Sequence, residues 1–225
     1  MRSIINEWIL ITAVLLLAGC PNDYKHERET LEEKPPAVQM DDMFVSEKTE
    51  EGKTRTVFRT NDERYWTLEG KTIWTVWDET ETEFRERAVA MGKTSGYSGG
   101  GYGIVFCHGE YMVKGILTPV MLVVMINNQG QYIIGKVIGG IFIDNGWWKT
   151  TPYLQRGTGE LNEIRVLFEA ENGEYCLEIN EHEIERFRDD DEPTLSGGKD
   201  GYIVVITPFD KFPDSSVNVY FMEDR

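Results

Sequence analysis

The chain has 225 residues, of which 39 are acidic and 23 are basic, so its formal net charge is -16 at pH 7. A surface this acidic repels the phosphates of nucleic acids and anionic headgroups, and we therefore expect no nucleic-acid partner. The length suits one sizeable domain with a buried core rather than two.

The first segment, residues 1–19, has the features of a targeting signal. Its apolar run begins at Ile9, follows Arg2, and ends in Leu17-Ala18-Gly19-Cys20. The run is too short for a membrane span. Its end resembles the site read by the bacterial lipoprotein signal peptidase, which implies that the signal is removed and that Cys20 is lipidated. We therefore expect a lipid-anchored, extracytoplasmic protein of the bacterial cell envelope; an ordinary secretory signal or an uncleaved anchor helix are the alternatives.

Residues 20–42 are predicted to form a flexible tether between the lipid and a folded domain. The segment is charged, contains Pro35-Pro36 and lacks apolar periodicity. These features are typical of disordered linkers. The folded domain is then expected to comprise residues 43–225.

Beyond the tether, apolar residues recur in short runs separated by glycine-containing segments, which is typical of strands rather than helices. Eleven strands are expected, at Thr54 to Arg59, Tyr65 to Leu68, Thr72 to Trp77, Phe84 to Met91, Tyr102 to Cys107, Val120 to Asn127, Tyr132 to Lys136, Leu161 to Glu169, Tyr175 to Asn180, Gly201 to Thr207 and Ser216 to Met222.

Two kinds of strand pattern predict two packed sheets. The strand from Leu161 to Glu169 alternates apolar and polar residues, as expected where one face is buried. The run from Val120 to Ile126 is apolar at every position and must be covered on both faces. Hairpin turns are expected at Asn127–Gly130 and at Glu171–Gly173, where the Asn-Gly pair favours a type I′ turn.

Several short motifs follow one another between Asn61 and Met222. They are Tyr102-Gly103-Ile104-Val105-Phe106, Trp147-Trp148, Leu161-Asn162-Glu163-Ile164-Arg165-Val166, and Tyr175-Cys176-Leu177-Glu178-Ile179-Asn180 followed by Phe187. Their order resembles the concanavalin A-like lectin and glucanase superfamily, and its laminin-G-like members look closest. The resemblance implies an all-β fold, a two-sheet antiparallel jelly-roll β-sandwich. One departure is the turn after Ile179, which lacks the usual Asn-Gly pair and is expected to extend from Asn180 to Glu183.

The sequence assigns no catalytic residue. Hydrolases of this fold place two carboxylates on one strand, and that pattern is absent. The nearest acidic cluster, Glu79, Glu81 and Glu83, is interpreted as a solvated strand edge. Cys107 and His108 are neighbours on a strand and point to opposite faces, so they cannot pair as nucleophile and base.

An aromatic pair supplies the candidate ligand site. Trp147 and Trp148 lie in a segment without strand alternation, with Asp144, Asn145 and Gln155 nearby in sequence. Exposed aromatic rings stack on sugars, and amide or carboxylate groups hold sugar hydroxyls. The alternative interpretation is structural, with one indole in the core and its neighbour covering a sheet edge.

Two further groups of residues leave alternatives open. The run Asp189, Asp190 and Asp191 is a candidate calcium site, against the alternative of a hydrated charge run; no other cofactor is expected. Cys107 and Cys176 remain after lipidation of Cys20, and they form either a disulfide or two buried free thiols.

These observations favour a membrane-anchored binding or interaction module whose partner is a glycan or a protein. A glycoside-processing enzyme with a non-standard carboxylate site and a purely structural envelope protein are the alternatives. An enzyme is the less favoured interpretation.

Overall fold

A computed structural model describes residues 12–13, 44–49, 53–59, 71–144, 147–195, 197–210 and 216–223. Cys20, the predicted tether and the strand expected at Tyr65 to Leu68 lie outside these residues. Apart from one short 3-10 turn at Pro208–Asp210, the regular elements of the described part are β-strands. Within it, no helix has the length and apolar character needed to cross a bilayer.

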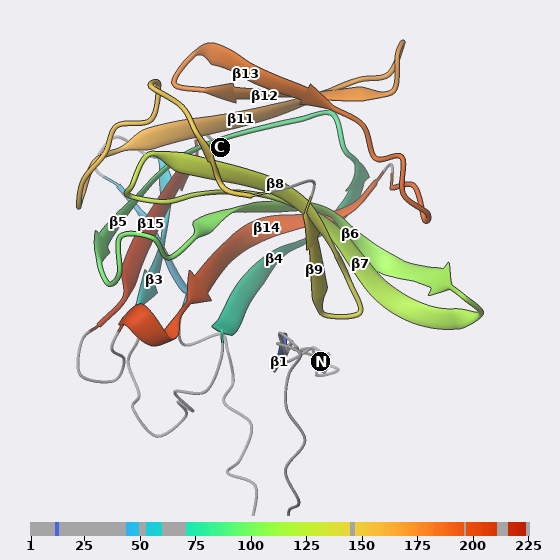
Figure 1. The fold of residues 1–225 in the computed structure, drawn as a ribbon, viewed down its shortest axis with the longest axis horizontal. Helices are drawn as coiled ribbons and strands as arrows, with labels where there is room; N and C mark the ends of the chain where they lie inside the picture. Colours follow the sequence, from blue (N-terminus) through green and yellow to red (C-terminus); the bar gives the residue numbers. More distant parts are fainter. Residues whose placement is uncertain are drawn as a thin grey trace, which may run out of the picture.

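The strands form two antiparallel sheets that lie face to face (Figure 1). Sheet A has the order β1-β4-β14-β6-β7-β8-β10, and β9 also pairs with β8. Its strands are β1 (Thr12–Ala13), β4 (Lys71–Glu83), β6 (Tyr102–Val113), β7 (Ile116–Ile126), β8 (Gln131–Ile138), β9 (Ile141–Asp144), β10 (Lys149–Thr150) and β14 (Gly197–Ile206).

Sheet B has the order β13-β12-β11-β5-β15-β3-β2. Its strands are β2 (Phe44–Lys48), β3 (Thr54–Arg59), β5 (Glu86–Ser95), β11 (Asn162–Glu169), β12 (Glu174–Ile179), β13 (His182–Phe187) and β15 (Asn218–Glu223). The all-β, two-sheet prediction is therefore confirmed. The strands β1, β2, β9, β10 and β13 were not expected from the sequence, because they are short or carry mixed polar residues; β1 lies within the predicted signal segment, residues 1–19.

Aromatic rings from both sheets meet in the core between them. Tyr202 of β14 stacks on Phe221 of β15 with ring centroids 4.4 Å apart, and Phe106 of β6 lies 5.6 Å from Tyr175 of β12. Burying a large apolar side chain contributes about 1.5–3 kcal/mol. These pairs therefore hold the two layers together along much of the sandwich.

The central strands of sheet A are buried on both faces, as the uninterrupted apolar run of β7 predicted. Val120, Leu122 and Val124 join the core against sheet B, whereas Met121 and Val123 belong to a second apolar cluster on the opposite face. We call the side that carries this second cluster the outer face of sheet A. Its cover includes Phe142 and Trp148, which pack against it.

Both predicted hairpins are present, but the type I′ assignment at Glu171–Gly173 is wrong. The turn joins β11 to β12, and Gly173 has a positive φ of 68° whereas Asn172 does not. The Gly173 N–H donates to the Glu169 carbonyl at 2.9 Å, closing a longer loop. A single left-handed glycine is enough for this geometry.

The turn after β12 also differs from the prediction, which extended it to Glu183. Asn180 and Glu181 both have positive φ, at 49° and 67°, and β13 already begins at His182. Two consecutive left-handed residues are the requirement of a tight type I′ turn. Asparagine tolerates this conformation well, and the pairing of Ile179 with His182 fixes the register.

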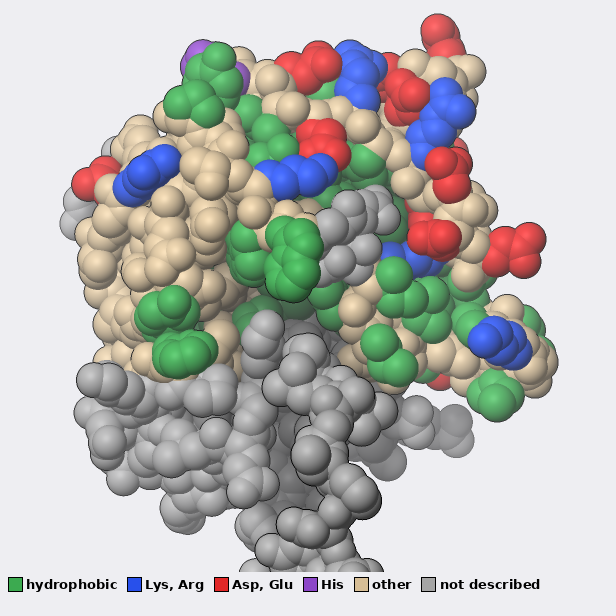
Figure 2. All heavy atoms as spheres, in the orientation of Figure 1, with side chains coloured by type: hydrophobic (Ala, Val, Ile, Leu, Met, Phe, Trp, Pro, Cys, Tyr) green, Lys and Arg blue, Asp and Glu red, His purple; other side chains and the backbone are tan. Residues whose placement is uncertain are grey.

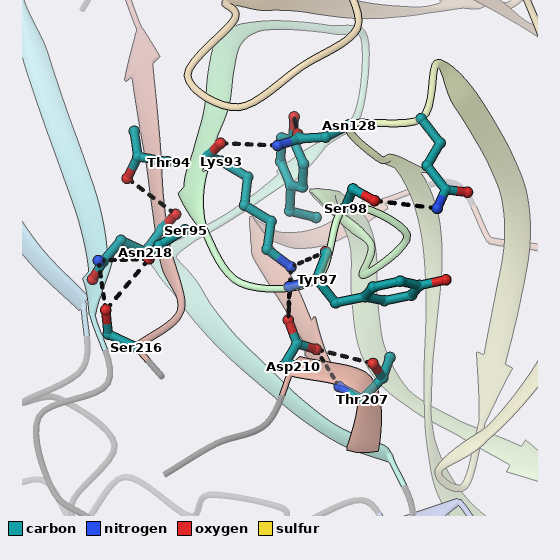
Figure 3. A network of polar contacts seen from close by, with 12 residues as sticks. Lys93, Thr94, Ser95, Tyr97, Ser98, Asn128, Thr207, Asp210, Ser216 and Asn218 are labelled. Atoms are coloured by element: carbon teal, nitrogen blue, oxygen red, sulfur yellow. Dashed lines mark hydrogen bonds and ion pairs between the residues drawn. The ribbon is translucent and has the colours of Figure 1, made fainter. Parts of the chain in front are cut away.

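A buried ion pair organises the loops at one end of the sandwich (Figure 3). Lys93 and Asp210 have fully buried side chains, and their charged atoms are 3.1 Å apart. Lys93 Nζ also donates to the Tyr97 carbonyl, while Asp210 accepts from the backbone N–H groups of Tyr97 and Thr207. The pair therefore fixes the loop after β5 and the turn after β14 against one another.

Removing one partner of this pair should destabilise the protein strongly. Asp210→Ala leaves the Lys93 ammonium buried without its counter-charge, which costs about 3–5 kcal/mol of unfolding free energy. Urea denaturation followed by circular dichroism measures this loss. Glu86→Ala, which breaks an exposed ion pair with Arg165, is the control and should leave the midpoint nearly unchanged. Equal midpoints for the two variants would contradict a structural role for the Lys93–Asp210 pair.

Candidate functional site

The outer face of sheet A is apolar at its centre. The residues of its cluster come from β6, β7, β8 and β14: Val105, Met121, Val123, Met125, Ile133, Val137, Ile203 and Val205. A glycosidase mechanism needs two carboxyl groups flanking the scissile bond. The residues of this cluster are all apolar.

The two neighbouring tryptophans have different roles at the edge of this face. Trp148 is half-buried and packs against the outer cluster. A Cβ on Gly101 would lie 3.0 Å from the Trp148 ring and 3.3 Å from the Met125 sulfur, so the glycine leaves room for the indole. Trp147 is 91% exposed. Of the pair, Trp147 therefore has its ring open to solvent, and Trp148 is held in place by packing.

The polar residues expected beside the tryptophans are only partly described. Asn145 lies outside the described residues, and of Asp144 only the backbone is described, at the end of β9. Gln155 is exposed in the loop before β11, where its backbone N–H and carbonyl both bond to the side chain of Asn162. Asn162 thus fixes the loop that presents Gln155.

A row of polar side chains, not recognised from the sequence, crosses the outer face further along the strands. Lys199 of β14 pairs with Glu81 of β4 on one side and with His108 of β6 on the other. Gly109 pairs with the core-facing Val120, so alternation places His108, and with it its partner Lys199, on the outer face. The face therefore carries a carboxylate, an ammonium and an imidazole side by side.

Irregular backbone on β6 and β14 creates this row. The register between the two strands shifts between Lys199 and Gly201, and Cys107 adopts a positive φ of 55°. A bulge of this kind changes which side chains face outward. Gly198 is required at the crossing, because a Cβ there would lie 2.3 Å from the His108 carbonyl oxygen. The single-sequence pattern gave no signal of the bulge.

Burial governs the protonation of His108. Burial and, as the smaller cause, the neighbouring positive charge of Lys199 together lower the pKa of the imidazole from 6.5 to about 4. The imidazole is therefore neutral at pH 7. Of the three groups in the row, Lys199 then supplies the positive charge.

The aspartate run is organised by a lysine. Lys136 Nζ lies 2.7 Å from Asp189 Oδ1 and donates to the carbonyls of Asp191 and Pro193, while Asp189 Oδ2 accepts from the Leu195 N–H. Within the described ranges, no three histidine, cysteine, aspartate or glutamate side chains are grouped closely enough to hold a metal ion. Calcium binding at this run stays a prediction.

The two remaining cysteines are free, so the disulfide alternative does not hold in this structure. Cys107 lies in the core with its sulfur 3.8 Å from the Tyr175 hydroxyl, and burial raises its pKa to about 12. Cys176 follows Tyr175 on β12 and alternates to the other face of that strand. The Cys107 thiol therefore lies in the core, and the Cys176 thiol lies on the opposite side of sheet B. Because its pKa is raised, the Cys107 thiol is not activated as a nucleophile.

No protein-family model and no curated protein sequence matches the chain. Solved structures do match it in fold. A glycoside hydrolase family 16 endo-glucanase from Bacteroides ovatus has a TM-score of 0.55 and 8% identity, covering 85% of this chain and 91% of its own. A second family 16 protein from Bacteroides ovatus has a TM-score of 0.51 and 9% identity, covering 81% and 85%.

The chain has the concanavalin A-like jelly-roll fold. The carbohydrate binding module CBM66 from Bacillus subtilis also matches, with a TM-score of 0.49 and 11% identity over 79% of this chain and 88% of that one. At these identities the likeness establishes the fold alone. It confirms the concanavalin A-like prediction, and the function of this jelly roll has to be argued from its own residues.

The lowered pKa of His108 predicts how the stability of the jelly roll depends on pH. As the pH falls from 6.5 toward about 4, the unfolded imidazole takes up a proton that the folded one does not. The free energy of unfolding should therefore decrease over this interval. Urea titrations between pH 4 and 7 should show a smaller decrease for His108→Gln than for the wild type. His182→Gln is the control, because His182 is exposed; equal slopes for wild type and His108→Gln would contradict the assignment.

Proposed function

We propose that this jelly roll is an extracytoplasmic binding module for carbohydrate, held at a membrane through lipidated Cys20. The observation that carries the proposal is the exposed indole of Trp147, next in the chain to Trp148, which packs against the outer face of sheet A. A flat aromatic ring in this position stacks on the C–H face of a sugar. Because Trp148 is held by packing, the backbone at the adjacent Trp147 has less conformational freedom.

The composition of the outer face favours binding over hydrolysis. Its central positions are apolar, and the row formed by Glu81, Lys199 and His108 supplies hydrogen-bond donors and acceptors rather than a closely spaced carboxylate pair. Such groups can hold sugar hydroxyls. The two Bacteroides ovatus structures are complexes with G4G3G-2F-DNP and with a G4G4G3G product, which supports the use of this fold for glycans.

Trp147→Ala should weaken glycan binding. A glycan array first identifies a ligand for the mature chain, and isothermal titration then measures its dissociation constant for each variant. Loss of the stacking ring should raise the constant about tenfold or more, equivalent to about 1.4 kcal/mol. Tyr153→Ala is the matched control, because Tyr153 is an exposed aromatic residue that stacks on His182 instead.

Two results would count against this function. A glycan array without any specific signal would contradict carbohydrate binding and would favour a protein partner or a structural role. Hydrolysis of a β-glucan panel that is lost when Glu81 and Glu83 are changed to Gln would favour the glycoside-processing enzyme.

Cys20→Ala should abolish lipidation. Metabolic labelling with a radioactive fatty acid should mark the wild type but not the variant, and the variant should leave washed membranes because its thioether-linked chains are missing. Cys176→Ala serves as the control, since its thiol is buried and should not be acylated. Continued labelling of Cys20→Ala would contradict the anchor.

A further inference from the structure

Two exposed aromatic rings lie together on loops at one end of the sandwich. Tyr97 belongs to the loop after β5 and is 37% exposed, and Phe209 lies in the turn Pro208–Asp210 after β14 and is 70% exposed. Their ring centroids are 5.3 Å apart, and the ring planes are tilted by 43°. We call these two residues the loop pair. Neither ring belongs to the apolar clusters on the two faces of sheet A, so packing of the sandwich does not account for them.

The buried ion pair of Lys93 and Asp210 fixes the backbone beneath both rings. The Tyr97 N–H donates to Asp210 Oδ1 at 2.6 Å, and Lys93 Nζ donates to the Tyr97 carbonyl at 2.9 Å. Phe209 directly precedes Asp210 in the chain. Figure 3 shows the Tyr97 ring pointing away from the ion pair. A ligand that contacts the loop pair therefore meets loops that are already ordered, which lowers the entropic cost of binding.

Uncharged groups surround the loop pair. Residues 94–101 and 201–209 carry no charged side chain. In Figure 2, the described atoms around the hydrophobic side chains at the place of the turn Pro208–Asp210 are tan, the colour of backbone and of uncharged polar side chains. Ser98 Oγ accepts from Nε2 of the exposed Gln129 at 3.2 Å, and the amide keeps further donor and acceptor capacity. Rings bordered by hydroxyl and amide groups suit a sugar, whose C–H faces stack and whose hydroxyls form hydrogen bonds.

The loop pair is connected to the segment that carries the exposed Trp147. The Trp148 ring lies against Gly101, at the end of the loop after β5. The same loop is tied to the β7–β8 turn, because the Asn128 N–H donates to the Ser98 carbonyl at 2.9 Å. Strand β10, which follows Trp148 directly, pairs with the start of β8. Both exposed aromatic positions therefore belong to connected loops at the same end of the sandwich.

We propose that the loop pair is a second subsite for glycan, so that the module binds an uncharged oligosaccharide chain across two aromatic positions rather than a single sugar. The inference rests on the proposed function and adds the length and the charge of the ligand. A chain that stacks on Trp147 extends along the connected loops and places a later sugar on Tyr97 and Phe209.

Charge and size select this occupant. The net charge of -16 repels an acidic polysaccharide, and the buried charges of Lys93 and Asp210 balance each other. A protein partner is the poorer occupant, since a stable interface buries about 800 Å² on each side. The loop pair offers two rings bordered by glycine, serine and amide groups, which is the scale of a sugar.

The chain-length dependence of binding tests the second subsite. An array of uncharged and acidic glycans, from monosaccharides to long oligosaccharides, is probed with the mature chain, and the wild type should bind long uncharged oligosaccharides most tightly. In isothermal titration, Phe209→Ala should raise the dissociation constant of the longest bound oligosaccharide about tenfold. It should leave the constant of the shortest bound glycan unchanged, whereas Trp147→Ala should raise both.

Two further variants and a stability measurement are the controls. Phe209→Tyr keeps an aromatic ring and should bind like the wild type. Tyr153→Ala removes an exposed ring elsewhere and should leave binding unchanged. Because the Phe209 ring is exposed, urea denaturation of Phe209→Ala should give the midpoint of the wild type.

The outcomes separate this subsite from the proposed function. Equal constants for wild type and Phe209→Ala at every chain length, with Trp147→Ala still weaker, would overturn the second subsite and leave the glycan function standing. An equal loss for short and long glycans would place both aromatic positions in one site and also overturn it. A preference for acidic glycans would overturn the assigned charge, and no glycan binding by the wild type would overturn both the subsite and the function.

Discussion

The structure depends on the burial of both faces of the central strands of sheet A. One face of β7 packs against sheet B, and the other belongs to the outer cluster beneath Phe142 and Trp148. An ionised carboxylate placed within this apolar cluster would lose its hydration. The cluster is bordered by Trp148, which precedes β10, and by the row of Glu81, Lys199 and His108.

Buried lysines organise the acidic loops of the sandwich. Lys93 neutralises Asp210 at one end, and Lys136 neutralises Asp189 in the connection between β13 and β14. In both pairs the ammonium also donates to backbone carbonyls, so a single side chain satisfies a carboxylate and orders the loop around it. A chain with this excess of acidic residues can in this way bury carboxylates, since each has a charged partner and further hydrogen bonds.

Local departures from regular strand geometry decide what the surface presents. The bulge at Cys107 returns the thiol to the core and leaves His108 beside Lys199 on the outer face. The left-handed pair Lys114 and Gly115 closes the β6–β7 hairpin tightly and makes its apolar end a rigid projection. Both features alter a strand by one or two residues, yet the first produces the polar row and the second closes the projecting hairpin. The β-sandwich supplies the frame, and these irregular positions supply its chemistry.

The sequence by itself determined the all-β class, the two-sheet arrangement and the hairpins after Ile126 and Glu169, because alternation and turn chemistry act between near neighbours along the chain. It also proposed the Trp147-Trp148 pair as a site without deciding which ring is exposed. Only the tertiary structure decided that, and it likewise gave Asp189 a partner 53 residues away in Lys136. Exposure and charge pairing are set by strands that meet across the sandwich, and these long-range contacts leave no periodic trace in the local sequence.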